Sequence, residues 1–155
     1  FDSNLGEIIW ALNPKNDSFD TLCAYIRSYT YDYLDDANIS CEISFPEDIP
    51  AIPISPEQRR NVFLMIKEIL NNIVKHSDSE VVELFLDIYD NSFSITIKDK
   101  GIGIEDEKLK EGNGLINLEK RTLDLGGSFE IKSKKGEGTS ISLSRIPFIK
   151  NPTKV

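Results

Sequence analysis

The stretch from Lys67 to His76 places side chains of different chemistry on one side of a predicted helix. Projected at about 100° per residue, Glu68, Asn72 and Lys75 fall within about 60° of arc, with Asn71 beside them. The Asn72 amide oxygen could ligate Mg²⁺, and the Lys75 ammonium could balance phosphate charge. The Glu68 carboxylate could orient or deprotonate a nucleophile. The alternative is a solvated helix face, and this stripe alone does not decide between the two.

A segment with two glycines follows a predicted strand. Asp99 lies at the end of that strand, where its carboxylate could accept a hydrogen bond from the exocyclic amine of adenine. Gly101 and Gly103 lack the Cβ atoms that would keep the backbone away from a flat base, and Ile104 closes the segment. Turns with two glycines are common, so this signal is weak by itself.

A second glycine pair, Gly112 and Gly114, precedes Leu115 at the start of a predicted helix. Backbone N–H groups at a helix start, together with the helix dipole, favour phosphate binding. Neither glycine segment matches the P-loop or the Rossmann fingerprint. The charged residues 105–111 between the two segments predict a short mobile lid.

The remaining polar candidates are few. The glycines around Thr139 predict a hairpin turn from which the threonine hydroxyl would approach Asp99. His76 is the only histidine, which excludes a multi-histidine metal site. Cys23 and Cys41 lie at apolar positions of periodic segments, so we expect two buried thiols rather than a disulfide framework or a zinc site.

Hydrophobic periodicity and turn residues predict the elements that position these candidates. Apolar residues recur at helical spacing over residues 1–12, and Asn13-Pro14 ends that helix. A stiff proline-rich connector covers residues 46–56, and Ser55 and Pro56 predict the start of the helix that carries Glu68. The predicted elements are helices over residues 17–37, 55–76 and 114–125, and strands over 39–45, 81–89, 93–98, 129–132 and 139–145.

Tight turns between consecutive strands predict a mixed, mostly antiparallel sheet. Three amphipathic helices would cover one face of that sheet. The fold class is therefore α+β, a two-layer α/β sandwich, and not a doubly wound α/β fold.

Composition limits the classes of function. The chain has 155 residues, a mean hydropathy of -0.27 and a net charge of -8, and residues 1–57 hold eleven acidic groups against two basic ones. This balance argues against nucleic-acid binding, which needs a basic surface. No apolar run is long enough for a transmembrane helix. The only methionine is Met65, so we expect a fragment of a longer protein.

With these motifs in this order, the chain resembles the ATP-binding domain of sensor histidine kinases, in the GHKL superfamily with its Bergerat fold. The stretch from Lys67 to His76 resembles the N box, in the variant with Glu four residues before the magnesium-binding Asn. The segment at Asp99 resembles the G1 box, and Gly112–Leu115 resembles G2. The segment Glu7–Pro14 is similar to the end of the dimerisation helices in the nitrate-sensor-like and hybrid-sensor branch.

This resemblance implies ATP and Mg²⁺ as cofactors and protein histidine kinase activity. It implies that Asn72 holds Mg²⁺ and that Glu68 acts as a base or polarising group. Lys100 departs from the small polar residue that is commoner in the family. The ATP-binding residues that the resemblance implies are Asn71, Asn72, Lys75, His76, Asp99, Gly101, Gly103, Ile104, Gly112, Gly114, Leu115 and Thr139.

The resemblance also implies a domain organisation and partners. Residues 1–14 would be the end of the dimerisation helical hairpin, residues 15–148 the catalytic domain and residues 149–155 a tail. No histidine precedes His76, so the phosphoacceptor would lie on a separate dimerisation domain of the same parent. We expect a monomeric, cytoplasmic fragment of a homodimeric parent, which can be tethered to the inner membrane and passes the phosphoryl group to a response-regulator receiver domain.

Two alternatives remain. The first is another ATPase of the superfamily, such as a chaperone, a topoisomerase, a mismatch-repair clamp or an anti-sigma serine kinase. An ATP-gated clamp would need a transducer domain after Arg145, where ten residues remain. The second is a non-catalytic regulatory module, and the intact Glu68, Asn72 and Asp99 argue against it.

Overall fold

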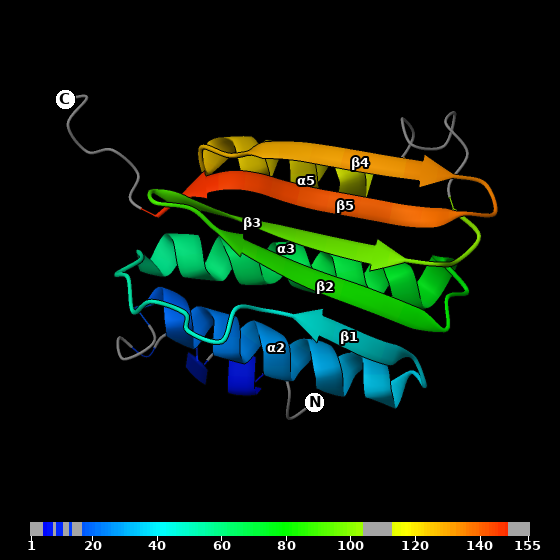
Figure 1. Ribbon diagram of the computed structural model, residues 1–155, viewed down its shortest axis with the longest axis horizontal. Helices are drawn as coiled ribbons and strands as arrows, with labels where there is room; N and C mark the ends of the chain where they lie inside the picture. Colours follow the sequence, from blue (N-terminus) through cyan, green and yellow to red (C-terminus); the bar gives the residue numbers. More distant parts are fainter. Residues whose placement is uncertain (1–4, 8, 11–12, 14–16, 104–112, 149–155) are drawn as a thin grey trace.

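One five-stranded sheet with helices on a single face forms the domain (Figure 1). The computed structural model describes residues 5–7, 9–10, 13, 17–103 and 113–148. The elements, in chain order, are α2 (Phe19–Asp36), β1 (Ser40–Ser44), α3 (Pro56–His76), β2 (Val81–Ile88), β3 (Ser92–Asp99), α5 (Asn113–Asp124), β4 (Ser128–Lys134) and β5 (Gly138–Pro147).

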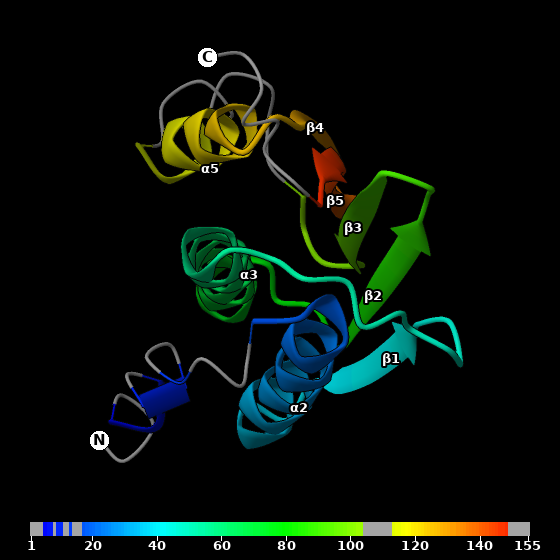
Figure 2. The same ribbon diagram turned by 90° about the vertical axis from the view of Figure 1, so that its left-hand side faces the viewer.

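The sheet is mixed, with the strand order β1-β2-β3-β5-β4. β1 pairs parallel with β2, and the other neighbours pair antiparallel. Figure 2 shows α2, α3 and α5 on the same side of the sheet, with α3 between the other two. The predicted α+β two-layer sandwich and its mixed sheet are confirmed.

The start of α3 follows the predicted capping chemistry. The Ser55 side chain accepts a hydrogen bond from the Gln58 backbone N–H at 3.0 Å, and Pro56 occupies the first turn. Proline is tolerated there because the first N–H groups of a helix have no intrahelical partner. This cap fixes where α3 begins and therefore where Glu68 and Asn72 lie along it.

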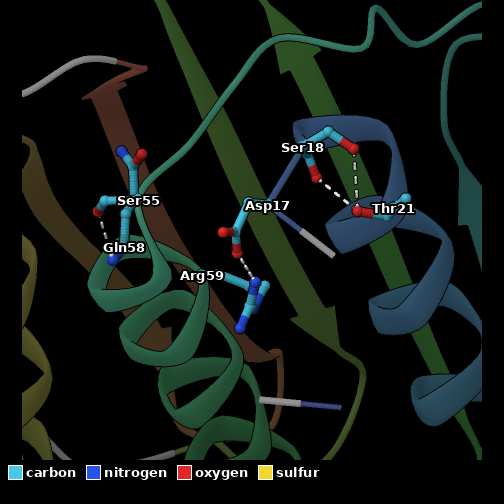
Figure 3. A network of polar contacts seen from close by, with 6 residues as sticks. All are labelled: Asp17, Ser18, Thr21, Ser55, Gln58 and Arg59. Carbon is cyan, nitrogen blue, oxygen red and sulfur yellow. Dashed lines mark hydrogen bonds and ion pairs between the residues drawn. The ribbon is translucent and has the colours of Figure 1, made fainter. Parts of the chain in front are cut away.

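The start of α2 has no side-chain cap, unlike the start of α3. Ser18 precedes the helix, but its side chain makes no capping bond to the backbone. Instead, the Thr21 hydroxyl donates to the Ser18 carbonyl at 2.8 Å, and Asp17 forms an ion pair with Arg59 of α3 (Figure 3). The Asp17 carboxylate therefore links the chain just before α2 to α3.

The core lies between the helices and the sheet. It is built by the apolar stripes of α2 and α3 against alternate residues of the strands, as amphipathic elements require. Of the two free cysteines, Cys23 is buried as predicted, while Cys41 is only half-buried because β1 lies at the edge of the sheet. The largest apolar side chains with almost no exposed surface are Phe19, Leu22, Ile26, Leu34, Met65, Ile66, Ile69, Leu70, Leu84, Phe93 and Ile95.

The N-terminal segment packs against α2 and α3. Its described residues 5–7 and 9–10 are helical, as the apolar spacing predicts. The Trp10 ring stacks on Tyr25, with centroids 4.1 Å apart, and the Arg59 guanidinium lies 5.2 Å from the Trp10 centroid. The Lys67 ammonium lies 2.7 Å from a Glu7 carboxylate oxygen. These contacts attach the segment to the outer side of α3.

Candidate functional site

A cavity of about 590 Å³ opens between the C-terminal half of α3 and the ends of β3 and β5. Its volume lies within the range of small-molecule sites. Among the described residues, it is lined by Glu68, Ile69, Asn72, Ile73, His76, Ser77, Asp99, Ile102, Gly103, Gly114, Leu115, Lys135, Thr139 and Ile141. Seven of the predicted site residues therefore meet around one cavity, together with Glu68.

Asp99 forms one end of this cavity. Its side chain is buried, and its Oδ1 accepts hydrogen bonds from the backbone N–H groups of Gly101 at 2.9 Å and Thr139 at 3.3 Å. Burial raises the pKa of Asp99, and the two hydrogen bonds oppose that rise. The result is a carboxylate in a fixed orientation that can accept a further hydrogen bond from a bound amine.

The two glycines after Asp99 lie close to protein backbone. A Cβ at Gly101 would lie 1.8 Å from the Ser77 carbonyl oxygen, and Gly101 does not line the cavity. Gly103 has a φ of +74°, and its Cβ would lie 2.1 Å from the Lys134 carbonyl oxygen. Both glycines therefore permit close contact with protein backbone, and Gly103 also lines the cavity, where its contact with a base stays a prediction.

Two backbone hydrogen bonds fix Ile102, in the segment that follows β3. The Ile102 N–H donates to the Ser77 carbonyl at 2.8 Å, and the Gly136 N–H donates to the Ile102 carbonyl at 2.7 Å. The Ile102 side chain is 56% exposed and lines the cavity. Its apolar surface is therefore available to a molecule bound in the cavity.

Glu68, Asn72 and Gly114 form the other end of the cavity. A Cβ at Gly114 would lie 3.3 Å from Glu68 Oε1 and 3.7 Å from Asn72 Nδ2, so both α3 side chains face the start of α5. The described residues hold no group of three or more His, Cys, Asp or Glu that could bind a metal ion. An amide beside a carboxylate instead fits Mg²⁺, which takes few protein ligands when phosphate oxygens are present.

The other predicted residues fall in different places. Asn71 lies outside this cavity, and its Oδ1 accepts a hydrogen bond from the Tyr33 hydroxyl at 3.1 Å. Lys75 is exposed and is absent from the described lining, so its phosphate contact stays a prediction. Ile104, Gly112 and the expected lid, residues 105–111, lie outside the described residues.

Thr139 lies where the sequence places it, and its backbone and its hydroxyl contact different residues. Its backbone N–H binds Asp99, whereas its hydroxyl pairs with the Ser133 hydroxyl at 2.7 Å. The hydrogen bond that joins Thr139 to Asp99 is thus made by the backbone, and the predicted approach of the hydroxyl to the carboxylate stays a prediction. The strand pairing of β4 with β5, which places Ser133 opposite Thr139, explains the contact between the two hydroxyls.

Six lining residues were not anticipated as site residues. Ile69 and Ile73 belong to the apolar face of α3, which faces the cavity where it passes the ends of the strands. Lys135 reaches the cavity from the turn between β4 and β5, and no spacing rule connects that turn to α3. The apolar Ile102 between two glycines was a readable signal for a contact residue. Ser77 and Ile141 complete the six.

The part of the chain that forms this site matches a known protein family. The sequence model of the histidine kinase-, DNA gyrase B-, and HSP90-like ATPase family matches residues 57–150. This range contains α3 except its first residue, α5, the last four strands and all the predicted site residues.

Two relatives are sensor kinases by name. The signal transduction histidine-protein kinase/phosphatase UhpB of Salmonella typhimurium is 31% identical over 137 residues, which are 88% of this chain and 27% of that protein. The signal transduction histidine-protein kinase/phosphatase DegS of Brevibacillus brevis is 28% identical over 80% of this chain and 31% of that protein. The chain thus spans less than a third of the length of either relative.

Solved structures share the fold. The histidine kinase domain of the blue-light activated histidine kinase from Erythrobacter litoralis EL346 superposes with a TM-score of 0.68 at 20% identity, over 82% of this chain and 61% of that chain. The histidine kinase AdeS of Acinetobacter baumannii superposes with a TM-score of 0.60 at 18% identity, over 83% and 65% of the two chains. At these identities the likeness concerns the fold alone.

Proposed function

Since the chain belongs to the family of histidine kinase-, DNA gyrase B-, and HSP90-like ATPases, we propose that it is the catalytic domain of a sensor histidine kinase. It binds ATP with Mg²⁺ in the cavity described above. It transfers the γ-phosphoryl group to a histidine on a separate dimerisation domain. The observation that carries this proposal is a single cavity of nucleotide size, with a fixed carboxylate at one end and a Glu–Asn pair at the other.

Asp99 receives the adenine in this proposal. The exocyclic amine of adenine donates to the carboxylate that Gly101 and Thr139 hold in place. Guanine presents a carbonyl oxygen at that position, so a buried acceptor would face another acceptor. An unpaired buried group of this kind costs about 1–3 kcal/mol. Ile102 at the mouth would cover one face of the base.

The phosphates extend toward the start of α5 in this proposal. Gly114 lies within the first turn of α5, and helix-start N–H groups suit phosphate oxygens. Asn72 would hold Mg²⁺, and the ion would offset the negative charge of the phosphates. Glu68 lies beside Asn72, where it can take a proton from an attacking imidazole. Lys75 and Lys135 are the candidate cations for the remaining phosphate charge.

Further parts of the proposal follow from the family. Residues 1–14 end the dimerisation hairpin, and residues 15–148 form the catalytic domain. The partners are the dimerisation domain of the same parent and a response-regulator receiver domain. Among the described residues, none of the helices has the length and apolar character to cross a membrane. The chain by itself would be monomeric, because a helical dimer interface needs partner helices.

Calorimetric titration with Mg-ATP and Mg-GTP tests the nucleotide part. We expect weak ATP binding and at least about tenfold weaker GTP binding, in line with the cost of the mismatch at Asp99. Equal binding of the two nucleotides would contradict the role of Asp99. A matched control is adenosine, which should retain the base contact and lose the dependence on Mg²⁺.

Labelling with γ-³²P-ATP tests the transfer. The chain alone should not become labelled, because His76 lines the nucleotide cavity itself and cannot reach an in-line position on its own γ-phosphate. Adding the upstream dimerisation helices in trans should label the added piece only. Acid-labile phosphate on His76 of the isolated chain would overturn the assignment.

A further inference from the structure

The face of the sheet that carries no helix holds a groove of about 940 Å³ over β3, β5 and β4. Figure 2 shows α2, α3 and α5 on the other side of the sheet, so the sheet separates this groove from the helices. Four lysines line the groove, Lys98 and Lys100 at β3 and Lys132 and Lys134 on β4. All four are exposed, and none of them lines the nucleotide cavity.

We propose that these four lysines, together with Gly138 and Ser140 of β5 between them, bind an acidic segment of a partner protein in an extended conformation. We call this set of six residues the basic furrow. The inference goes beyond the proposed function and does not rest on it, because none of the six residues lines the nucleotide cavity. It also gives a purpose to Lys100, which stands where a small polar residue is commoner in the family.

One pair of lysines faces the other side of the furrow across β5. In the strand register, Lys98 of β3 and Lys132 of β4 both lie opposite Ser140. Neighbouring strands are about 4.8 Å apart, so roughly 10 Å separates the backbones of the two lysines, with a small side chain between them. A carboxylate above Ser140 can therefore accept hydrogen bonds from both ammonium groups and from the serine hydroxyl.

The second pair of lysines repeats this arrangement nearer the turn between β4 and β5. Lys134 lies opposite Gly138, and a Cβ at Gly138 would lie 2.9 Å from the Lys100 Cα. The glycine has no side chain to fill the space between these two lysines. A second carboxylate can thus bind beside the first.

The described part of the chain neutralises these lysines poorly. The Lys100 Nζ lies 3.9 Å from Glu83 Oε1, and the Lys98 Nζ lies 5.2 Å from the centroid of the Phe85 ring. Lys132 and Lys134 form no ion pair with any described residue. Exposed ammonium groups gathered in this way attract an anion, and salt screens the attraction.

The spacing of the lysines along the strands favours an extended peptide as the ligand. Side chains on one face of a strand repeat about every 6.8 Å, which is the spacing from Lys98 to Lys100 and from Lys132 to Lys134. A peptide extended along β5 repeats its own side chains at the same interval. Two acidic residues at alternate positions of that peptide therefore meet one lysine pair each.

Acidic side chains close both ends of the furrow. Glu130 of β4 lies opposite Ser142, two residues beyond Ser140 along β5, and Glu137 precedes Gly138 in the turn. These carboxylates would repel a longer acidic run, a polyphosphate chain or an anionic membrane laid across the sheet. The net charge of -8 also opposes a general attraction of polyanions. The furrow therefore fits two acidic residues that are flanked by neutral ones.

Fluorescence anisotropy of a labelled peptide tests this assignment with the chain as it stands. The probe is a short threonine-rich peptide with two glutamates at alternate positions, since threonine favours the extended conformation. The matched peptide has the same composition with the two glutamates adjacent, so that they project to opposite faces. We expect the first peptide to bind at low ionic strength and the second to bind at least about fivefold more weakly.

Charge removal identifies the surface that the peptide contacts. The double variant Lys98→Gln with Lys132→Gln should weaken binding of the first peptide at least about fivefold, because it removes both partners of one carboxylate. The double variant Arg60→Gln with Lys120→Gln is the matched control, since it removes the same charge at exposed positions that line neither this groove nor the nucleotide cavity. It should leave peptide binding within twofold, and circular dichroism should show that both variants are folded.

The outcomes are distinct. No binding of the first peptide, equal binding of the two peptides, or equal losses in the two double variants would overturn the basic furrow as a peptide site. Binding of inorganic polyphosphate or of phosphatidylserine vesicles in place of the first peptide would also overturn it, because the site would then take phosphate. Failure of the chain to bind ATP would contradict the proposed function and leave the furrow standing.

Discussion

The carboxylate of Asp17 and the guanidinium of Arg59 form an ion pair that joins the residue before the α2 cap to the first turn of α3 (Figure 3). Arg59 is 1% exposed, and its guanidinium also lies over the Trp10 ring. A single buried cation thus contacts both the N-terminal segment and the chain entering α2. Charges are retained in protein interiors only when they are paired in this way.

Removal of the Asp17 carboxylate should destabilise the domain. Asp17→Ala leaves the buried Arg59 without this partner, and bonds to charged groups contribute about 1.5–3 kcal/mol. We expect the free energy of unfolding in urea to fall by about 2 kcal/mol. Asp35→Ala, at an exposed position of α2, is the control and should change the free energy of unfolding by less than about 0.5 kcal/mol. Equal effects of the two substitutions would show that the pair contributes nothing.

Trp10 is the only tryptophan, so its fluorescence reports on the N-terminal segment alone. The described residues of this segment are attached through side-chain contacts that include Trp10 on Tyr25 and Glu7 on Lys67. Elements with few buried contacts open before the whole domain unfolds. We expect the emission to shift to the red at a lower urea concentration than the loss of far-UV circular dichroism. Tyr25→Ala should widen the gap, and coincident transitions in both proteins would contradict local opening.

Asp99→Asn should separate stability from binding. Burial raises the pKa of Asp99 above its ordinary 3.8, so the folded state binds a proton more readily than the unfolded chain. The charged form therefore costs stability, and that cost grows as pH rises through the raised pKa. Asn keeps an oxygen for the Gly101 and Thr139 N–H groups without the charge.

The thermal midpoint of the nucleotide-free Asp99→Asn domain at pH 7 should accordingly equal or exceed that of the original chain, with a weaker fall between pH 4 and pH 7. ATP affinity should drop by about tenfold or more, because the amide N–H₂ would face the adenine amine. A lower thermal midpoint together with unchanged ATP affinity would contradict both the expected stability and the expected loss of binding.

Asn72→Ala should remove the magnesium-dependent part of ATP binding. Asn72 is the amide beside Glu68 at the phosphate end of the cavity, and Mg²⁺ takes hard oxygen ligands. Calorimetry with and without Mg²⁺ measures the difference in affinity. Asn71→Ala is the matched control, since the neighbouring amide faces Tyr33 and should leave the magnesium dependence unchanged. Unchanged dependence in Asn72→Ala would remove Asn72 as the ligand.

Cys23 should be inert toward thiol reagents in the folded protein. Burial, followed by the charge of Asp20, raises the pKa of Cys23 to about 12, so only about 10⁻⁴ of it is thiolate at pH 8. Cys41 is half-buried, and burial also raises its pKa, against the opposing effect of Arg27. Peptide mapping after iodoacetamide treatment should find slow modification of Cys41 and none of Cys23. Both should react at equal rates in guanidinium chloride, and native labelling of Cys23 would indicate an open core.

The elements and the sheet class were predictable because local signals agreed with one another. Ser55 and Pro56 mark the start of α3, and Gly126, with a φ of +89°, follows the last turn of α5. The sequence did not predict the parallel pairing of β1 with β2, because that pairing depends on where α3 crosses the sheet. Long-range pairing leaves no local trace in the sequence.

The sequence predicted which motif residues belong to the site. It did not predict which atoms of these residues make the contacts. Glu68, Asn72 and Asp99 line one cavity as expected, since helical spacing and a strand end fix their directions. The backbone contacts of Gly101 and the hydroxyl contact of Thr139 were not predictable. Both depend on segments far away in the chain, namely the end of α3 and strand β4.

Ser77 and Ile102, which line the cavity, belong to segments that main-chain hydrogen bonds hold together. Ser77, Ile102 and Gly136 are linked through their peptide groups alone, at 2.8 and 2.7 Å. Two of the three positions can therefore change side chain without altering the bonds that bring these segments together. Substitutions at Ser77 and Ile102 should accordingly alter the lining of the cavity, and thus its preference among ligands. They should have less effect on the backbone shape of the segment that follows β3. The glycine positions alone resist drift, because any side chain at Gly101 or Gly103 would collide with a neighbouring carbonyl.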